Sequence, residues 1–156
     1  MSVREGLEFE SPILSDCAPL HRLTETLLET PDSVRMLRDA TRGGVAAVLN
    51  EIAQSSHLGI TIDEGCIPVR REVQSACELL GLDPLYVANE GKFIAIVAPD
   101  VVDRLIAKLR ALPGGSDACR IGEVHTTHPG LLSMKTAMNT RRVIPMPLGE
   151  QLPRIC

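Results

Sequence analysis

The chain has 156 residues, long enough for one domain with a buried core, and its 44% hydrophobic and 23% charged residues exclude a disordered polypeptide. The net charge of −4 and the near absence of aromatic residues, with no Trp and one Tyr, argue against binding of nucleic acid or an anionic membrane surface. No apolar run reaches the roughly 18 residues that span a bilayer, and residues 1–6 lack the apolar stretch of a signal peptide, so we expect a cytoplasmic protein.

The first third of the chain predicts a helix, a strand and a second helix. Asp16 is expected to cap a helix in which leucines recur at helical spacing. These leucines are Leu20, Leu23, Leu27 and Leu28. The elements expected to follow are a strand over 34–37, a turn over 39–44, a helix over 45–54 and a strand over 60–62.

Prolines and glycines delimit the elements of the remaining chain. Pro68 is expected in the first turn of a helix that Gly81 ends, and Pro99 begins another helix. Between these helices, the apolar run over 93–98 is typical of a buried central strand. Later strands are predicted over 121–124, 131–135 and 143–144. This order predicts an α+β domain, with α/β-like alternation, in which helices cover a mixed sheet.

The last twelve residues differ in composition from the rest. Prolines at 145, 147 and 153 forbid a helix or a central strand. We therefore expect a domain over 1–144 and a mobile tail over 145–156 that ends in a thiol, Cys156.

The five cysteines are odd in number and form no Cys-x-x-Cys pair, which favours free thiols over disulfides or zinc ligands. A terminal Cys156 is either an incidental residue or a functional thiol that the tail carries. Its own α-carboxylate is expected to raise the pKa of the thiol, which suits a group that is modified and carried better than an unaided nucleophile.

Two short polar segments could carry chemistry. The turn over 39–44 contains Thr41, Arg42, Gly43 and Gly44 before a helix, which is either a tight turn with a helix cap or an anion site; it is not a P-loop. Asn89–Lys92 is either a solvated turn or a source of an acid, base or phosphate ligand, with Glu90 and Lys92 as the reactive groups. His125 and His128 are expected in a surface loop, since no further metal ligands accompany them.

Three runs together resemble one family, the HypE hydrogenase maturation factors, within the superfamily of aminoimidazole ribonucleotide synthetase and selenophosphate synthetase. These runs are Ala40–Gly44, Leu79–Lys92 and Gly149–Cys156. The last two are specific to HypE, and the resemblance covers nearly the whole chain. It implies the family's C-terminal domain, without the N-terminal domain that binds ATP and forms the homodimer.

The resemblance also implies an activity and its partners. HypF would load a carbamoyl group onto Cys156, and ATP-dependent dehydration with Mg²⁺ would convert it to a thiocyanate. The cyanide would pass to iron on the HypC–HypD scaffold and become a ligand of [NiFe] hydrogenase. Glu90 is the expected base, through partial burial that raises its pKa, and Thr41, Arg42, Gly43 and Gly44 are the expected phosphate ligands. Lys92 is expected to be either a further phosphate ligand or an ion-pair partner.

A second hypothesis stays open. The chain could be a carrier or interaction module that presents a carbamoylated Cys156 to partner proteins without ATP-dependent catalysis. In either case we expect this domain to bind no metal and, by itself, no nucleotide tightly.

Overall fold

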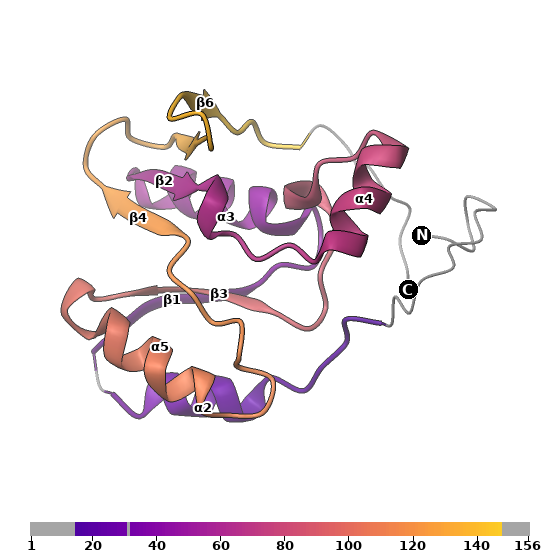
Figure 1. Cartoon of the computed structure of the whole chain (residues 1–156). Coiled ribbons are helices and arrows are strands. Elements are labelled where there is room, and N and C mark those ends of the chain that lie inside the picture. The colour runs from indigo at the N-terminus through magenta and orange to yellow at the C-terminus, as the bar shows by residue number, and fades with distance from the viewer. Residues whose placement is uncertain (1–14, 31, 148–156) are drawn as a thin grey trace.

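The fold is that of a computed structural model, which describes residues 15–30 and 32–147 and confirms the predicted α+β class (Figure 1). Within these residues the helices are α2 (His21–Leu28), α3 (Gly44–Ser56), α4 (Arg71–Leu80) and α5 (Val102–Arg110). Single 3-10 turns form η1 (Glu64–Cys66), η2 (Pro84–Tyr86) and η3 (Pro99–Val101). The strands are β1 (Val34–Asp39), β2 (Gly59–Asp63), β3 (Phe93–Val97), β4 (Gly122–His125), β5 (Leu132–Lys135) and β6 (Arg141–Val143).

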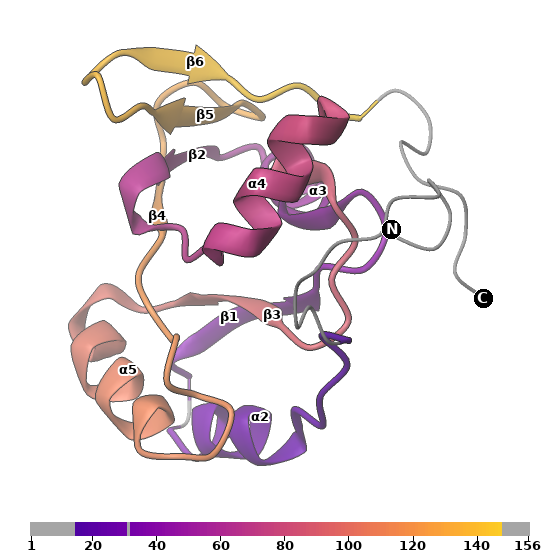
Figure 2. The same ribbon diagram turned by 45° about the vertical axis from the view of Figure 1, so that its right-hand side comes forward.

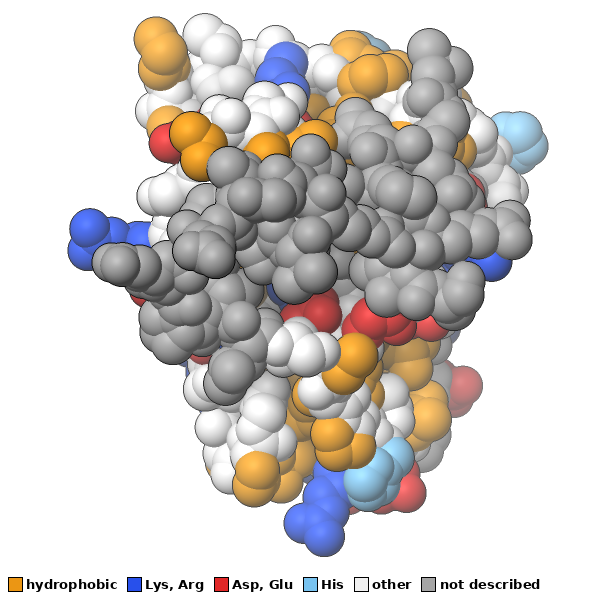
Figure 3. All heavy atoms as spheres, turned by 90° about the vertical axis from the view of Figure 1, so that its right-hand side faces the viewer, with side chains coloured by type: hydrophobic (Ala, Val, Ile, Leu, Met, Phe, Trp, Pro, Cys, Tyr) orange, Lys and Arg blue, Asp and Glu red, His pale blue; other side chains and the backbone are white. Residues whose placement is uncertain are grey.

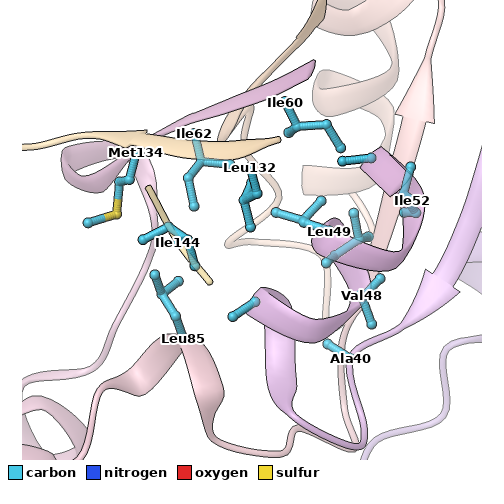
Figure 4. Close-up of a cluster of buried hydrophobic side chains, with 13 residues drawn as sticks. Ala40, Val48, Leu49, Ile52, Ile60, Ile62, Leu85, Leu132, Met134 and Ile144 are labelled. Carbon is cyan, nitrogen blue, oxygen red and sulfur yellow. The ribbon is translucent and has the colours of Figure 1, made fainter. Parts of the chain in front are cut away.

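A mixed sheet of four strands, in the order β4-β2-β5-β6, forms the upper half of the molecule in Figure 1. Strand β2 is antiparallel to β4 and parallel to β5, and β5 is antiparallel to β6. Alternate residues of β2 and β5, such as Ile62 and Leu132, point toward α3 and are buried with Leu49 in one hydrophobic cluster (Figure 4).

Strands β1 and β3 form a separate antiparallel ribbon that lies between two hydrophobic clusters (Figure 2). Along β3, Ile94 and Ile96 pack toward α3 and the four-stranded sheet, whereas Phe93, Ala95 and Val97 pack toward α2 and α5. The apolar run is therefore explained by burial on both faces. The prediction of a central strand was wrong, because among the described strands β3 pairs with β1 alone.

Two helix starts also differ from the predictions. Helix α2 begins at His21 without a side-chain cap, and Asp16 instead accepts a hydrogen bond from the backbone of Glu90. Helix α4 begins at Arg71, three residues after Pro68. Its end was predicted correctly, since Gly81 closes it with a left-handed φ of 66°.

None of the helices in residues 15–30 and 32–147 is long and apolar enough to cross a membrane. Among the described side chains on the face in Figure 3, acidic groups gather near the middle and Lys and Arg side chains lie toward the margin.

Candidate functional site

The turn before α3 places two glycines, of which Gly44 is buried, and a guanidinium at the start of a helix. Gly43 and Gly44 both have positive φ, of 67° and 63°, and Gly43 caps α3 without a side-chain hydrogen bond. The side chain of Arg42 is exposed, and Thr41 is half-buried beside it. Because the N-terminus of a helix carries partial positive charge and free N–H donors, this turn has the chemistry to hold an anion.

The glycine at position 44 lets the start of α3 approach the η2 segment closely. A Cβ atom on Gly44 would lie 2.5 Å from the carbonyl oxygens of both Leu85 and Val87. Nearby, the backbone N–H of Asn89 donates to the carbonyl oxygen of Ala40 over 3.0 Å. The structure thus brings together the two sequence runs Ala40–Gly44 and Leu79–Lys92.

The chain leaves the domain beside this same turn. Ile144 is completely buried between Leu85 and Ile62 (Figure 4), where its side chain contributes roughly 2 kcal/mol of hydrophobic stabilisation. Its carbonyl oxygen accepts a hydrogen bond of 3.1 Å from the buried Asn50 side chain. Three residues later, the Cγ atom of Pro147 lies 3.1 Å from the position a Cβ of Gly43 would take. Cys156 lies outside the described residues.

Tyr86, the single tyrosine, bonds to this exit segment. Its hydroxyl donates to the carbonyl oxygen of Pro145 over 3.0 Å. Burial raises the pKa of the Tyr86 phenol, as does the carboxylate of Asp83, while Arg142 lowers it. The phenol therefore stays protonated and remains a donor at neutral pH.

Replacing Tyr86 by Phe is expected to lower the free energy of unfolding by about 1 kcal/mol or less, through loss of this bond. Because the folded-state pKa is raised, the contribution of the hydroxyl is complete below pH 10 and disappears as the pH rises through the folded-state value. Urea titrations of the wild type and the Phe variant at pH 7 and above pH 10 measure this difference in the free energy of unfolding. A difference between the two proteins that grows with pH would contradict the assignment.

Glu90 and Lys92 are both exposed, so the expected partial burial of Glu90 was wrong. The backbone of this segment is held by a hydrogen bond, because the N–H of Glu90 donates to Oδ2 of Asp16 over 3.0 Å.

Sequence reasoning missed Asp16, Asn50 and Tyr86 as parts of this site. The signals in the sequence were the polar Asn50 among the apolar residues of the predicted helix and the single tyrosine, Tyr86.

The histidines do not form a metal site. Among the described residues, no group of three or more His, Cys, Asp or Glu could hold a metal ion. His128 lies in the expected loop, but His125 ends β4. Its Nε2 atom lies 2.8 Å from the hydroxyl of Thr61, and its Nδ1 atom lies 2.8 Å from the carbonyl oxygen of Thr127.

The four described thiols are free and differ in exposure. Cys17 and Cys66 are exposed, whereas Cys77 is buried. Burial raises the pKa of Cys77, with a further contribution from Asp83, and burial also raises the pKa of Cys119 against the opposing charge of Arg110.

Iodoacetamide at pH 7.5 is therefore expected to label the two exposed thiols first and Cys77 last, because the thiolate is the reactive form and access is limited at Cys77. Labelling of Cys119 is expected to accelerate as the pH rises above the ordinary thiol range. Peptide mass spectrometry over time measures each site. Equal labelling rates at Cys17 and Cys77 in the folded protein would contradict this order.

Comparison with known families places the domain. Residues 1–131 match the family described as "AIR synthase related protein, C-terminal domain". The chain belongs to this family. The resemblance seen in the sequence runs is confirmed by its relatives: the carbamoyl dehydratase HypE of Cupriavidus necator is 51% identical over 156 residues, which cover 100% of this chain and 44% of the relative.

Solved structures agree with this assignment. The crystal structure of the hydrogenase maturation protein HypE in complex with ATP matches with a TM-score of 0.91 and 43% identity, over 99% of this chain and 48% of that chain. A crystal structure of a HypE–HypF complex matches with a TM-score of 0.88 and 42% identity, over 94% of this chain and 47% of that chain. The chain spans about half the length of the relatives it matches.

Proposed function

We propose that this chain is the C-terminal domain of a carbamoyl dehydratase, with a domain over 1–144 and a tail over 145–156 that carries the substrate on Cys156. The 51% identity to a protein named carbamoyl dehydratase HypE supports the reaction. The observation that carries the proposal is the exit of the chain: Pro145 is bonded to Tyr86, and Pro147 lies against Gly43 in the turn that suits an anion. The tail therefore starts beside the candidate phosphate site.

The reaction removes water from an S-carbamoyl group in two steps. First, the carbamoyl oxygen attacks the γ-phosphorus of ATP, ADP departs, and one proton leaves the nitrogen. Second, the remaining N–H proton is taken by a base while the C–O bond breaks and inorganic phosphate departs. The product on Cys156 is a thiocyanate, S–C≡N. Shielding the phosphorylated intermediate from water prevents its hydrolysis.

The residues of this chain would orient phosphate and move the second proton. The N–H groups of Gly43 and Gly44 and the Arg42 guanidinium would bind phosphate oxygens, with Thr41 as a hydroxyl donor and Lys92 as a second cation. Glu90 would take the proton. Because Glu90 is exposed in this chain, the proposal requires that the ATP-binding domain cover it during the reaction.

Mg²⁺ would neutralise charge on the phosphates of ATP when bound. The described residues offer no cluster of three acidic, His or Cys ligands, so we assign its ligands to the ATP-binding domain. A solved relative contains ATP, which supports ATP as the substrate.

Partners follow from the same proposal. HypF would load Cys156, which a HypE–HypF complex among the relatives supports. A HypC–HypD scaffold would accept the cyanide, and the homodimer would form through the ATP-binding domain.

Intact-mass analysis tests the function. The chain is fused behind the ATP-binding domain of a HypE relative and incubated with HypF, ATP and carbamoyl phosphate. We expect a gain of one carbamoyl group followed by loss of one water, whereas a sample freed of ATP directly after loading should keep the carbamoyl group. Loading without any loss of water would support the carrier hypothesis instead, and absence of loading would overturn both.

A further inference from the structure

We propose that Asp16 is a positioning residue for the reaction, because its carboxylate holds the backbone of Glu90 against the turn that precedes α3. The inference rests on the proposed function, and it adds a residue that precedes α2. Asp16 would touch neither ATP nor the carbamoyl group; it would act through Glu90.

Two separate contacts join the segment around Asp16 to the Asn89–Lys92 segment. The N–H of Glu90 donates to Oδ2 of Asp16 over 3.0 Å, a charge-assisted hydrogen bond. In addition, the backbone carbonyl of Asp16 occupies the space that a Cβ atom on Gly91 would need. The glycine thus permits a close backbone approach, and the carboxylate then fixes its position.

The other side of the segment is bonded to the candidate phosphate turn. The N–H of Asn89 donates to the carbonyl oxygen of Ala40 over 3.0 Å, and its side-chain amide donates to the carbonyl oxygen of Val87 over 2.7 Å. Glu90 therefore follows directly after a residue that is bonded to the turn, and its own N–H is bonded to Asp16. Without Asp16, the described structure leaves the Glu90 side chain on an exposed and less restrained backbone.

The sequence around Asp16 suits this role better than helix capping. Four residues, Cys17 to Leu20, separate Asp16 from His21, the first residue of α2, so the carboxylate is too early in the chain to bond the start of this helix. A base must lie within hydrogen-bond reach of the proton it removes, and small displacements of such a group are costly for the rate. Fixing Glu90 through its main chain leaves the side chain free to react.

The test compares two substitutions in the fusion with the ATP-binding domain. Asp16→Ala removes the acceptor and is expected to lower kcat for dehydration on the order of 10-fold, with the KM for ATP changed less than about 2-fold. Asp16→Asn keeps a side-chain carbonyl oxygen at the same reach and is expected to restore most of kcat. Asp100→Ala, an exposed aspartate of η3, is the matched control and is expected to match the wild type.

Amide hydrogen exchange at Glu90 gives an independent readout. Exchange should be faster in Asp16→Ala than in Asp16→Asn, because the N–H loses its acceptor. An unchanged kcat in Asp16→Ala would overturn the inference, as would equal losses in both Asp16 variants. A fusion whose wild type never dehydrates its carbamoyl group would overturn the proposed function itself, whereas an active wild type with a fully active Asp16→Ala would overturn only the role of Asp16.

Discussion

Replacement of Cys156 by Ala is expected to abolish both carbamoyl loading and thiocyanate formation in the fusion with an ATP-binding domain. The reason is covalent: in the proposed reaction the substrate is attached to this sulfur, and no neighbouring group can replace the missing bond. Intact mass after incubation with HypF, carbamoyl phosphate and ATP is the measurement.

The exposed thiols supply the control for this experiment. Cys17 and Cys66 are accessible to reagents, so each could accept an adventitious modification. A variant with both changed to Ser should load and dehydrate like the wild type. Full loading of Cys156→Ala, or loss of loading in the double Ser variant, would place the carbamoyl group on another thiol and remove the basis of the proposed function.

The substitution Gly44→Ala is expected to have the largest effect on folding. Its Cβ atom would lie 2.5 Å from two carbonyl oxygens, of Leu85 and Val87, and its φ of +63° is unfavourable for alanine. Rigid backbone lies on both sides, so α3 or η2 must move. We expect a loss of about 3 kcal/mol or more in the free energy of unfolding, measured by urea titration of this chain.

Gly81→Ala is the matched control. Gly81 has a similar φ of +66°, but apart from its chain neighbours no atom of the described residues lies within 4 Å of the position of its Cβ. Only the cost of placing an alanine in the left-handed conformation remains, and we expect the free energy of unfolding to fall by about 1 kcal/mol. Equal losses in the two variants would show that the close approach of η2 to α3 contributes nothing beyond the cost of a left-handed alanine.

Local patterns in the sequence predicted most elements because each depends on neighbours in the chain. The Gly81 cap appears as expected, and of the four leucines at helical spacing Leu23 and Leu27 are buried, whereas Leu28 is exposed. The pairing of β3 could not be predicted this way. An apolar strand is compatible with a central position or with a ribbon covered on both faces, and the choice depends on which distant segments lie beside it.

The candidate site was predictable in its residues and not in its arrangement. The two polar runs were recognisable in the sequence, and the structure brings them together through Ala40 and Asn89. The roles of Asp16 and Tyr86 depend on bonds to residues 74 and 59 positions away, which no local pattern reveals. The exposure of Glu90 is likewise a property of the tertiary fold.

The packing of both hydrophobic clusters depends on one strand register, that of the ribbon formed by β1 and β3. Neighbouring side chains of β3 belong alternately to one cluster and to the other, with Ile94 and Ile96 on one side and Phe93 and Val97 on the other. Inserting a single residue into β3 would turn each set of side chains toward the other hydrophobic cluster. Phe93 would then face the cluster that now contains Ile94 and Ile96, and the isoleucines would face the cluster around α2 and α5. The irregular pairing between Val34 and Met36 lies at the far end from Asp39, so any length variation is best tolerated away from the turn before α3.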